Sequence, residues 1–297
     1  MKIVSLLPAA SEILVDLGLL DEIVAVSHEC NYPKNLKTKF QITSSNIPDN
    51  LEQSAIDLIV TNAIKNHIPL YDINTDKLRD INPDIIVTQG LCDVCSISEN
   101  QIEATLKNKR CTLSSKTKVI SLNGTSFNEI CSDILKLGKL INKEEIAKDL
   151  VSNARKTKLQ ISTINTNKSI LLLEWIDPYF SAGHWIPEQI EMAGFKSAIG
   201  KKGEKSKKIT IEEIIKSDPD FIGLICCGYN LDENKSFANQ VYNDKRINHL
   251  TAIKNQQIFA FDSDSYFSRP SLRILEGAMQ LKNAITNNDN RFHCKRY

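Results

Sequence analysis

The chain has 297 residues, of which 41% are hydrophobic and 25% charged, and its formal net charge is +1. This composition is typical of a soluble globular protein, and the length leaves room for two cores. The Lys and Arg residues are dispersed, and Gly and Ser interrupt the densest basic run at Lys201–Lys208, which argues against a nucleic-acid-binding protein. No apolar run reaches the length of about 18 residues that a transmembrane helix needs.

The first residues resemble the start of a secretory signal but do not continue as one. Pro8, Glu12 and Asp16 interrupt the apolar stretch, and no small-residue cleavage site follows. The eight cysteines fit a reducing compartment, because a chain of this length folds without disulfide staples. The sequence therefore predicts a cytoplasmic protein, or an extracytoplasmic one if a leader precedes residue 1.

Short runs rich in Ile, Val and Leu alternate with longer stretches of helical periodicity in the first half of the chain. This alternation predicts parallel strands joined by crossover helices. We expect the strands of the first half at Lys2–Leu7, Ile23–Ser27, Leu58–Thr61 and Ile85–Thr88.

A long helical stretch separates the two halves. Ser126–Leu140 and Glu144–Ile164 carry apolar residues at helical spacing, and no Pro or Gly interrupts the second segment. At the rise of an α-helix that segment spans about 30 Å. We expect it to act as a rigid connection, which favours a small rocking motion over a large hinge closure.

The second half repeats the alternation, with strands expected at Ser169–Glu174, Phe221–Cys226 and Gln257–Phe261. The predicted fold class is α/β, with two Rossmann-like lobes of parallel strands, a long rigid interlobe helix and a ligand cleft between the lobes. The expected domains are an N-terminal α/β lobe, an interlobe helical segment and a C-terminal α/β lobe at residues 1–122, 123–166 and 167–297.

A weak internal repeat supports two similar halves. Asn74–Ile86 aligns without gaps with Thr210–Ile222, so that the two Pro-Asp pairs coincide and Asp76 falls on Glu212. Each copy has a capping residue, an acidic first turn, a short helix, a Pro-Asp stop and a buried strand. One duplicated lobe is the simplest explanation.

The unusual side chains of this sequence follow the predicted strands. In open parallel sheets, ligands bind outside the carboxyl ends of the strands, and aromatic faces with a few convergent polar groups are typical of such pockets. Ser11 is also expected to be the N-cap of the first helix. The predicted ligand-binding residues are Ser11, Tyr32, Gln89, Trp175, Tyr179, His184, Trp185, Tyr229 and Arg269.

Arg269 precedes Pro270, which we expect to open a helix. An arginine in that place can bind a ligand carboxylate, amide or phosphate through its planar fork. It can equally form a surface ion pair with Asp262 or Asp264 nearby.

Four residues have the types that bind metal ions. Cys92 and Cys95 form a Cys-x-x-Cys pair, and His28 and Cys30 follow another strand, so together they would form a tetrahedral Cys3His site for zinc or iron. The same pair of cysteines can act in redox chemistry, although its position does not match the thioredoxin arrangement. A third interpretation is thiols without a special role.

No nucleophile elbow, P-loop, dinucleotide-binding or zinc-protease motif occurs in the sequence. Their absence favours a binding protein over an enzyme.

Several motifs resemble one known family. They are the opening Ile3–Leu14, the segments Ser27–Pro33 and Thr88–Cys95, and Glu174–Trp185 with its Ala-Gly-His-Trp ending. These residues resemble the helical-backbone (class III) substrate-binding proteins of ABC importers, which take up cobalamin, haem and ferric siderophores. Within that family the motifs are most similar to a leaderless cobalamin-binding subgroup.

The resemblance implies a two-lobed protein that closes on cobalamin or another corrinoid, with His28 or His184 reaching the metal of the ligand. It also implies that Asp76 and Glu212 contact an ABC permease if the protein is exported; acids favoured by a helix N-terminus are the alternative explanation of these two residues. A cytosolic metal-binding protein or enzyme that uses the four Cys and His residues is the alternative function.

Overall fold

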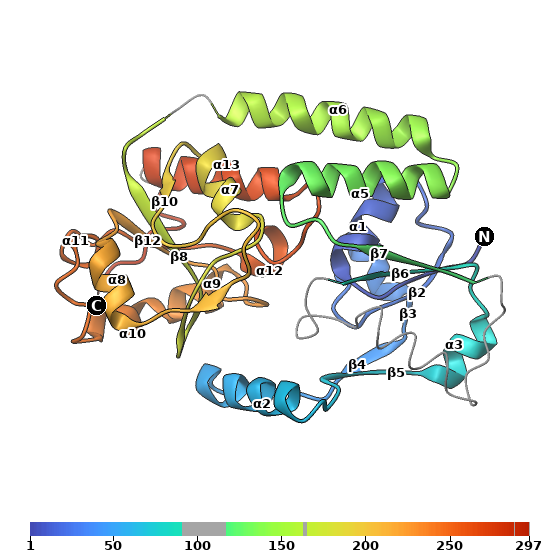
Figure 1. Cartoon of the computed structure of the whole chain (residues 1–297), viewed down its shortest axis with the longest axis horizontal. Coiled ribbons are helices and arrows are strands. Elements are labelled where there is room, and N and C mark those ends of the chain that lie inside the picture. The colour runs from blue at the N-terminus through green and yellow to red at the C-terminus, as the bar shows by residue number, and fades with distance from the viewer. Residues whose placement is uncertain (91–116, 163–164, 288, 297) are drawn as a thin grey trace. The chain divides into compact units, whose positions relative to one another are not determined.

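The computed structural model describes residues 1–90, 117–162, 165–287 and 289–296 (Figure 1). Cys92 and Cys95 lie outside the described residues. The chain forms two compact units, an N-terminal unit of residues 1–124 and 128–151 and a C-terminal unit of residues 125–127 and 152–297. The domain boundaries expected at residues 122 and 166 stay a prediction.

The N-terminal unit is built on a parallel five-stranded sheet in the order β3-β2-β1-β6-β7. Both faces of its central strands are buried, which explains their unbroken runs of apolar residues. A separate antiparallel pair, β4 and β5, lies beside it. The strands are β1 (Ile3–Ser5), β2 (Ile23–Val26), β3 (Phe40–Gln41), β4 (Thr43–Ser45), β5 (Tyr71–Ile73), β6 (Ile85–Gln89) and β7 (Lys118–Leu122).

Helices α1 (Pro8–Asp16), α2 (Gln53–Lys65) and α3 (Thr75–Ile81) and the 3-10 helix η1 (Lys34–Thr38) complete the described part of this unit. Two longer helices, α5 (Phe127–Leu140) and α6 (Glu144–Ile161), each contain residues of both units. Among the described residues, no helix is long and apolar enough to cross a membrane.

The C-terminal unit contains a six-stranded sheet. Strands β10, β8, β12 and β13 are parallel, and β9 and β11 extend the sheet in antiparallel pairing. The strands are β8 (Ser169–Ile176), β9 (Tyr179–Ser181), β10 (Lys196–Ser197), β11 (Lys207–Lys208), β12 (Phe221–Leu224) and β13 (Ile258–Ala260). The helices are α7 (Ile186–Met192), α8 (Ile211–Ser217), α9 (Leu231–Ser236), α10 (Ala238–Asn243), α11 (Thr251–Lys254), α12 (Ser263–Tyr266) and α13 (Ile274–Thr286).

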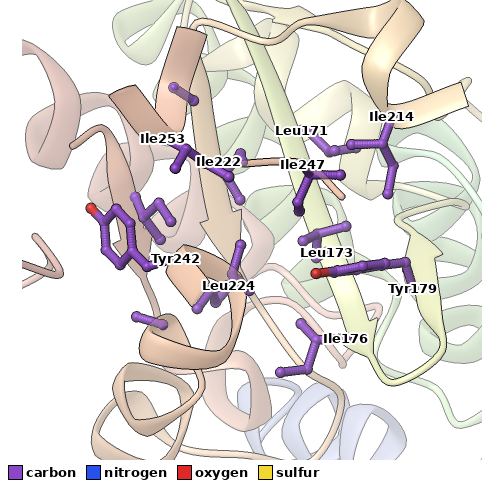
Figure 2. Close-up of a cluster of buried hydrophobic side chains, with 14 of the residues drawn as sticks. Leu171, Leu173, Ile176, Tyr179, Ile214, Ile222, Leu224, Tyr242, Ile247 and Ile253 are labelled. Carbon is purple, nitrogen blue, oxygen red and sulfur yellow. The ribbon is translucent and has the colours of Figure 1, made fainter. Parts of the chain in front are cut away.

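Apolar side chains of this sheet pack against the surrounding helices in one core cluster (Figure 2). Leu171 and Leu173 come from β8, Leu224 comes from β12, and Ile253 and Tyr242 come from helices on the same face. These side chains are 0–2% exposed, so the cluster holds the strand ends that carry the predicted ligand-binding residues in fixed positions.

The predicted internal repeat is confirmed in the cap geometry. The Asn74 side chain accepts a hydrogen bond from the Lys77 N–H at the start of α3, and Thr210 accepts one from the Glu213 N–H at the start of α8. The two helices end on residues with positive φ, 45° at Asn82 and 29° at Asp218.

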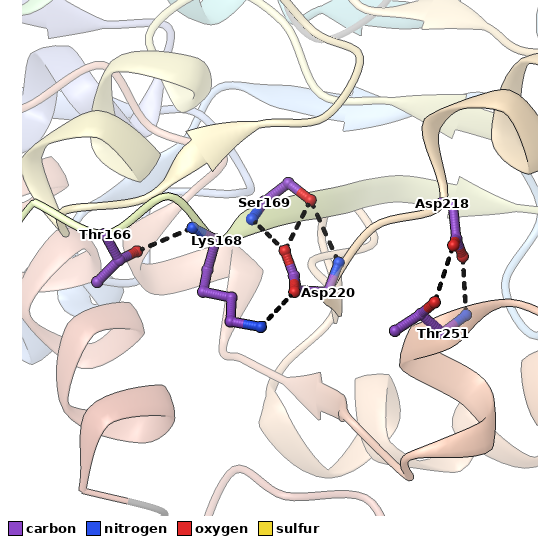
Figure 3. A network of polar contacts seen from close by, with 6 residues as sticks. All are labelled: Thr166, Lys168, Ser169, Asp218, Asp220 and Thr251. Atoms are coloured by element: carbon purple, nitrogen blue, oxygen red, sulfur yellow. Dashed lines mark hydrogen bonds and ion pairs between the residues drawn. The ribbon is translucent and has the colours of Figure 1, made fainter.

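The aspartates that follow these helices clamp equivalent strands. Asp84 accepts a hydrogen bond of 2.7 Å from the Lys2 N–H just before β1, and Asp220 accepts one of 2.8 Å from the Ser169 N–H at the start of β8 (Figure 3). Strand order agrees as well, because β2-β1-β6-β7 matches β10-β8-β12-β13. The predicted α/β fold class is thus confirmed.

Three local predictions are wrong. The strand expected at Leu58–Thr61 lies inside α2, because a short β-branched run fits a helix or a strand and its surroundings decide. Ser11 is not an N-cap, since α1 begins at Pro8 and its N-cap is Leu7. Pro270 does not open a helix, since α13 begins at Ile274.

Candidate functional site

The carboxyl ends of β8 and β12 bring two predicted aromatic residues together. The rings of Trp175 and Tyr229 are 5.9 Å apart and tilted by 51°, and the Phe237 ring lies edge-on to Tyr229 at 5.0 Å. All three side chains are half-buried. Trp175, Tyr229 and Phe237 are called the aromatic cluster below. The chain reverses at Gly228, whose φ of 82° favours glycine.

Asn234 fixes the backbone behind the aromatic cluster. This fully buried side chain accepts a hydrogen bond from the Cys226 N–H at 2.8 Å and donates to the carbonyls of Tyr229 at 3.1 Å and Phe261 at 3.0 Å. It therefore joins the ends of β12 and β13. The sequence offers no signal for this role, because Asn234 lies in a polar helix whose neighbours are mostly exposed.

The segment after β13 contacts the same backbone. The N–H groups of Ser263 and Asp264 donate to the Tyr229 carbonyl at 3.1 and 3.2 Å, and the Asp262 side chain caps α12. The Arg269 guanidinium is only 3% exposed and forms a 2.7 Å ion pair with Asp264. The predicted Asp–Arg pair is therefore present, but its arginine is buried inside the unit rather than spread on the surface.

His184 and Trp185 form a second aromatic pair. Their rings stack at 5.7 Å, and the His184 backbone, with φ of 53°, is held by Glu204 through a 2.6 Å hydrogen bond. Burial, with a smaller contribution from Lys205, lowers the pKa of His184. Its buried Nε2 makes no hydrogen bond within the part of the chain that the structure describes.

Trp185 itself is buried, at 8% exposure, and its Nε1 donates to the Phe267 carbonyl at 3.1 Å. A tryptophan in a ligand-binding motif is expected to offer its face to the ligand. In the structure, the indole instead supports the segment that carries Arg269.

The Tyr179 hydroxyl is hydrogen-bonded outside the aromatic cluster. The hydroxyl donates to Asp244 at 3.1 Å, and Arg246 forms an ion pair of 2.7 Å with the same carboxylate. Burial first and then Asp244 raise the pKa of Tyr179, while Arg246 lowers the pKa of Asp244. Two cavities, of about 320 and 350 Å³, adjoin Tyr179, and both are also lined by Asp177 and Arg246.

In the N-terminal unit, His28 follows β2 and is bound by Thr43. The Thr43 hydroxyl lies 2.7 Å from His28 Nδ1 and accepts a 3.0 Å hydrogen bond from the His28 N–H. The Tyr71 ring lies 5.7 Å from the imidazole. Burial lowers the pKa of His28, so the ring is neutral and able to offer a nitrogen to a metal or a polar group at neutral pH.

Ser11 and Cys30 meet in the interior of the N-terminal unit. The Ser11 hydroxyl lies 2.8 Å from the Ser5 hydroxyl and 3.1 Å from the Cys30 thiol, and both Ser11 and Cys30 are almost fully buried. By contrast, Tyr32 is 45% exposed, and Gln89 is buried at the last position of β6.

Only two of the four predicted metal ligands lie among the described residues. His28 is bonded to Thr43 and Cys30 is in contact with Ser11, while Cys92 and Cys95 lie outside the described residues. Within the ranges that are described, no group of three or more His, Cys, Asp or Glu residues is placed to hold a metal ion. The zinc or iron site therefore stays a prediction from the sequence.

Comparison with known proteins agrees with this fold. A model described as periplasmic binding protein matches residues 3–265. The ABC transporter substrate-binding lipoprotein YvrC of Bacillus subtilis, itself uncharacterized, is 24% identical over 294 residues, which are 96% of this chain and 79% of that protein.

Two solved structures from Vibrio cholerae share the fold. The periplasmic vitamin B12 binding protein BtuF is 18% identical with a TM-score of 0.66, and 95% of each chain is covered. The periplasmic heme binding protein HutB is 17% identical with a TM-score of 0.71, covering 96% of this chain and 99% of that one.

The family match over residues 3–265 defines a solute-binding protein of the periplasmic type. The chain belongs to the periplasmic binding protein family. The resemblance to this family found in the sequence is thereby confirmed, while the cobalamin-binding subgroup stays a prediction. The expected cytoplasmic location is wrong, because the matching family is periplasmic and the related B. subtilis protein is a lipoprotein.

Proposed function

We propose that this protein binds a corrinoid, or a related flat metal chelate, as the solute-binding component of an ABC importer. The observation that carries the proposal is the aromatic cluster at the carboxyl ends of β8 and β12, where Trp175 and Tyr229 are half-buried and lie 5.9 Å apart. The V. cholerae proteins of the same fold are named for vitamin B12 and heme, and both of these ligands are large tetrapyrrole macrocycles.

The chemistry of the aromatic cluster suits such a ligand. Indole and phenol rings bury a large apolar area at a small cost in side-chain entropy and stack on flat macrocycles. The half-exposed rings are already held by Asn234 and the core, so little ordering is required when the ligand arrives. The aromatic cluster thus provides a preformed apolar surface.

Each unit also has polar or metal-binding side chains that are candidates for ligand contacts. The neutral imidazoles of His28 and His184 are candidate ligands for the metal of a chelate. Tyr32 and Gln89 are proposed ligand contacts of the N-terminal unit. Ser11, Tyr179, Trp185 and Arg269 are nearly buried and bonded to protein groups, so we propose that they support the ligand-binding backbone.

Asp76 and Glu212 are proposed contacts to the permease. They occupy equivalent first-turn positions on α3 and α8, and both are exposed. Asp76 forms a 3.0 Å surface pair with Arg79, and the backbone N–H and the Thr210 hydroxyl lower the pKa of Glu212. Two carboxylates presented by matching elements would bind a pair of arginines on a transporter.

The test is an absorption titration of the purified full chain with aquocobalamin, dicyanocobinamide and hemin as separate probes. At least one probe should bind with a spectral shift, and Trp175→Ala and Tyr229→Ala should each weaken that binding about tenfold, since a tenfold change is about 1.4 kcal/mol, within the range of a lost aromatic contact.

Matched controls separate the ligand site from the rest of the surface. Leu159→Ala removes an exposed side chain on α6, and Asp76→Ala with Glu212→Ala removes the proposed permease contacts, so all of these should bind the probe as the unmodified protein does. If no probe binds, or if Trp175→Ala and Leu159→Ala bind equally well, the proposed ligand class is wrong.

A further inference from the structure

Gln189 makes an unusual double contact. This fully buried residue of α7 donates through Nε2 to the Tyr266 carbonyl at 3.1 Å and to the Ile274 carbonyl at 2.8 Å. The two acceptors flank the segment 267–273, which carries the buried Arg269. One side-chain amide therefore ties both ends of this segment to α7.

Two further features shape the same contact. Trp185, one turn before Gln189, donates from Nε1 to the Phe267 carbonyl at 3.1 Å. On α13, a Cβ at Gly277 would lie 2.5 Å from Gln189 Nε2 and 2.7 Å from the Tyr266 carbonyl oxygen. Glycine at this position lets α13 approach α7 closely enough for both hydrogen bonds of Gln189.

We propose that Gln189 is a positioning residue of the ligand site, which holds segment 267–273 so that Arg269 stays paired with Asp264. The ion pair joins this segment to Asp264, whose N–H donates to the Tyr229 carbonyl of the aromatic cluster at 3.2 Å. This inference rests on the proposed function, because it assigns Gln189 to the site that the aromatic cluster defines.

The chemistry of a primary amide explains why glutamine suits this position. Its NH2 group has two hydrogens in one plane, so it can satisfy two carbonyls at once, whereas a hydroxyl has only one hydrogen to donate. Buried carbonyls that lose their donors are costly. Loss of Gln189 should therefore shift the Tyr266 and Ile274 backbone toward water or other donors, and the Phe267 carbonyl that binds Trp185 would move with them.

Intrinsic fluorescence gives a test that needs no ligand. The chain has two tryptophans, so Trp175→Phe leaves the Trp185 indole as the reporter. In that background, Gln189→Leu should shift the emission to longer wavelength and increase acrylamide quenching. Gly277→Ala should act in the same direction, although Gly→Ala inside a helix otherwise stabilises it. Ile190→Val, which trims a neighbouring core side chain of α7, should leave Trp185 unchanged.

Gln189→Glu gives a pH-dependent signature. At neutral pH it places a carboxylate against two carbonyl oxygens, and on protonation it regains one donor. Trp185 quenching in this variant should therefore fall as the pH is lowered, while the parent Trp175→Phe protein stays constant. Emission and quenching of Gln189→Leu equal to those of the parent protein would overturn the inference.

Ligand binding distinguishes failure of the inference from failure of the proposed function. With the probe that the unmodified protein binds, Gln189→Leu should weaken binding about tenfold, or 1.4 kcal/mol, and Ile190→Val should not. If Gln189→Leu changes Trp185 but leaves probe binding intact, the positioning role is wrong. If the unmodified protein binds no probe, the proposed function fails, and the fluorescence result alone decides whether Gln189 holds the segment.

Discussion

The two units share a framework but differ in the side chains that follow their strands. In both, a capped helix ends on a left-handed residue and an aspartate clamps the first strand of the sheet, Asp84 in one unit and Asp220 in the other. After the strands, however, the N-terminal unit has the buried contact of Ser11 with Cys30 and the pair of His28 with Thr43, whereas the C-terminal unit has the aromatic cluster. The two units therefore share the contacts that hold their sheets together and differ in the side chains at the strand ends.

The largest expected effect is a loss of stability when a side chain that hydrogen-bonds the backbone at the strand ends is removed. Asn234→Ala removes a fully buried amide that hydrogen-bonds four backbone groups, and it should lower the free energy of unfolding by about 3 kcal/mol. Asn123→Ala in the N-terminal unit removes an exposed acceptor for the Gly90 N–H and should cost about 1 kcal/mol. Urea denaturation measures both. Equal losses would show that the two units secure their strand ends equally.

A second comparison concerns the two aspartate clamps. Asp220 accepts hydrogen bonds from the Ser169 N–H and hydroxyl and forms a 2.6 Å ion pair with Lys168 (Figure 3), while Asp84 accepts one from the Lys2 N–H. Asp220→Ala should therefore cost about 1.5 kcal/mol, and Asp84→Ala less than half as much. Thermal unfolding of both variants, with Asp232→Ala on the exposed face of α9 as the control, measures the difference. A larger loss for Asp84→Ala would contradict the comparison.

Sequence patterns predicted the strands, helices and fold class better than the contacts of the candidate ligand-binding residues. Alternating strand and helix periods and the repeat of Asn74 and Thr210 were enough for the fold class and for the equivalence of the two halves. The pairing of Trp175 with Tyr229 followed from the rule that parallel strands end at one edge. The strand expected at Leu58–Thr61 is instead part of α2, because a short β-branched run fits a helix or a strand, and Leu58 is 70% exposed rather than buried in a sheet.

Side-chain direction could not be predicted from residue type. Trp185 and Arg269 belong to types that bind ligands, yet both are buried and bonded to protein groups. Gln189 and Asn234 gave no signal at all, because their partners are carbonyls and amides that approach them only in the folded chain. Such roles depend on tertiary contacts far apart in the sequence, which periodicity and composition do not encode.

The smallest expected effect is an opposite pH dependence of two buried carboxylates. Burial, outweighing the Asn123 and Gly124 N–H groups, raises the pKa of Asp133 on α5 above 3.8. The stabilisation that Asp133 contributes is therefore fully present below pH 3.8, the ordinary pKa of an aspartate. It is lost as the pH rises through the pKa of Asp133 in the folded protein. For Glu188 on α7, burial acts in the raising direction, but Lys158, Lys202 and the Phe127 N–H together lower the pKa below 4.5.

The Glu188 contribution is therefore present above pH 4.5 and is lost as the pH falls through its folded pKa. Asp133→Asn keeps an acceptor for the two N–H groups and Glu188→Gln keeps one for Phe127, so each variant mainly removes a charge. On acidification from neutral pH, the Tm of Asp133→Asn should fall relative to the unmodified protein, whereas the Tm of Glu188→Gln should rise relative to it. Calorimetry from neutral to acidic pH measures these Tm values. If the Tm difference between variant and unmodified protein changes in the same direction for both variants, the two carboxylates do not have opposite environments.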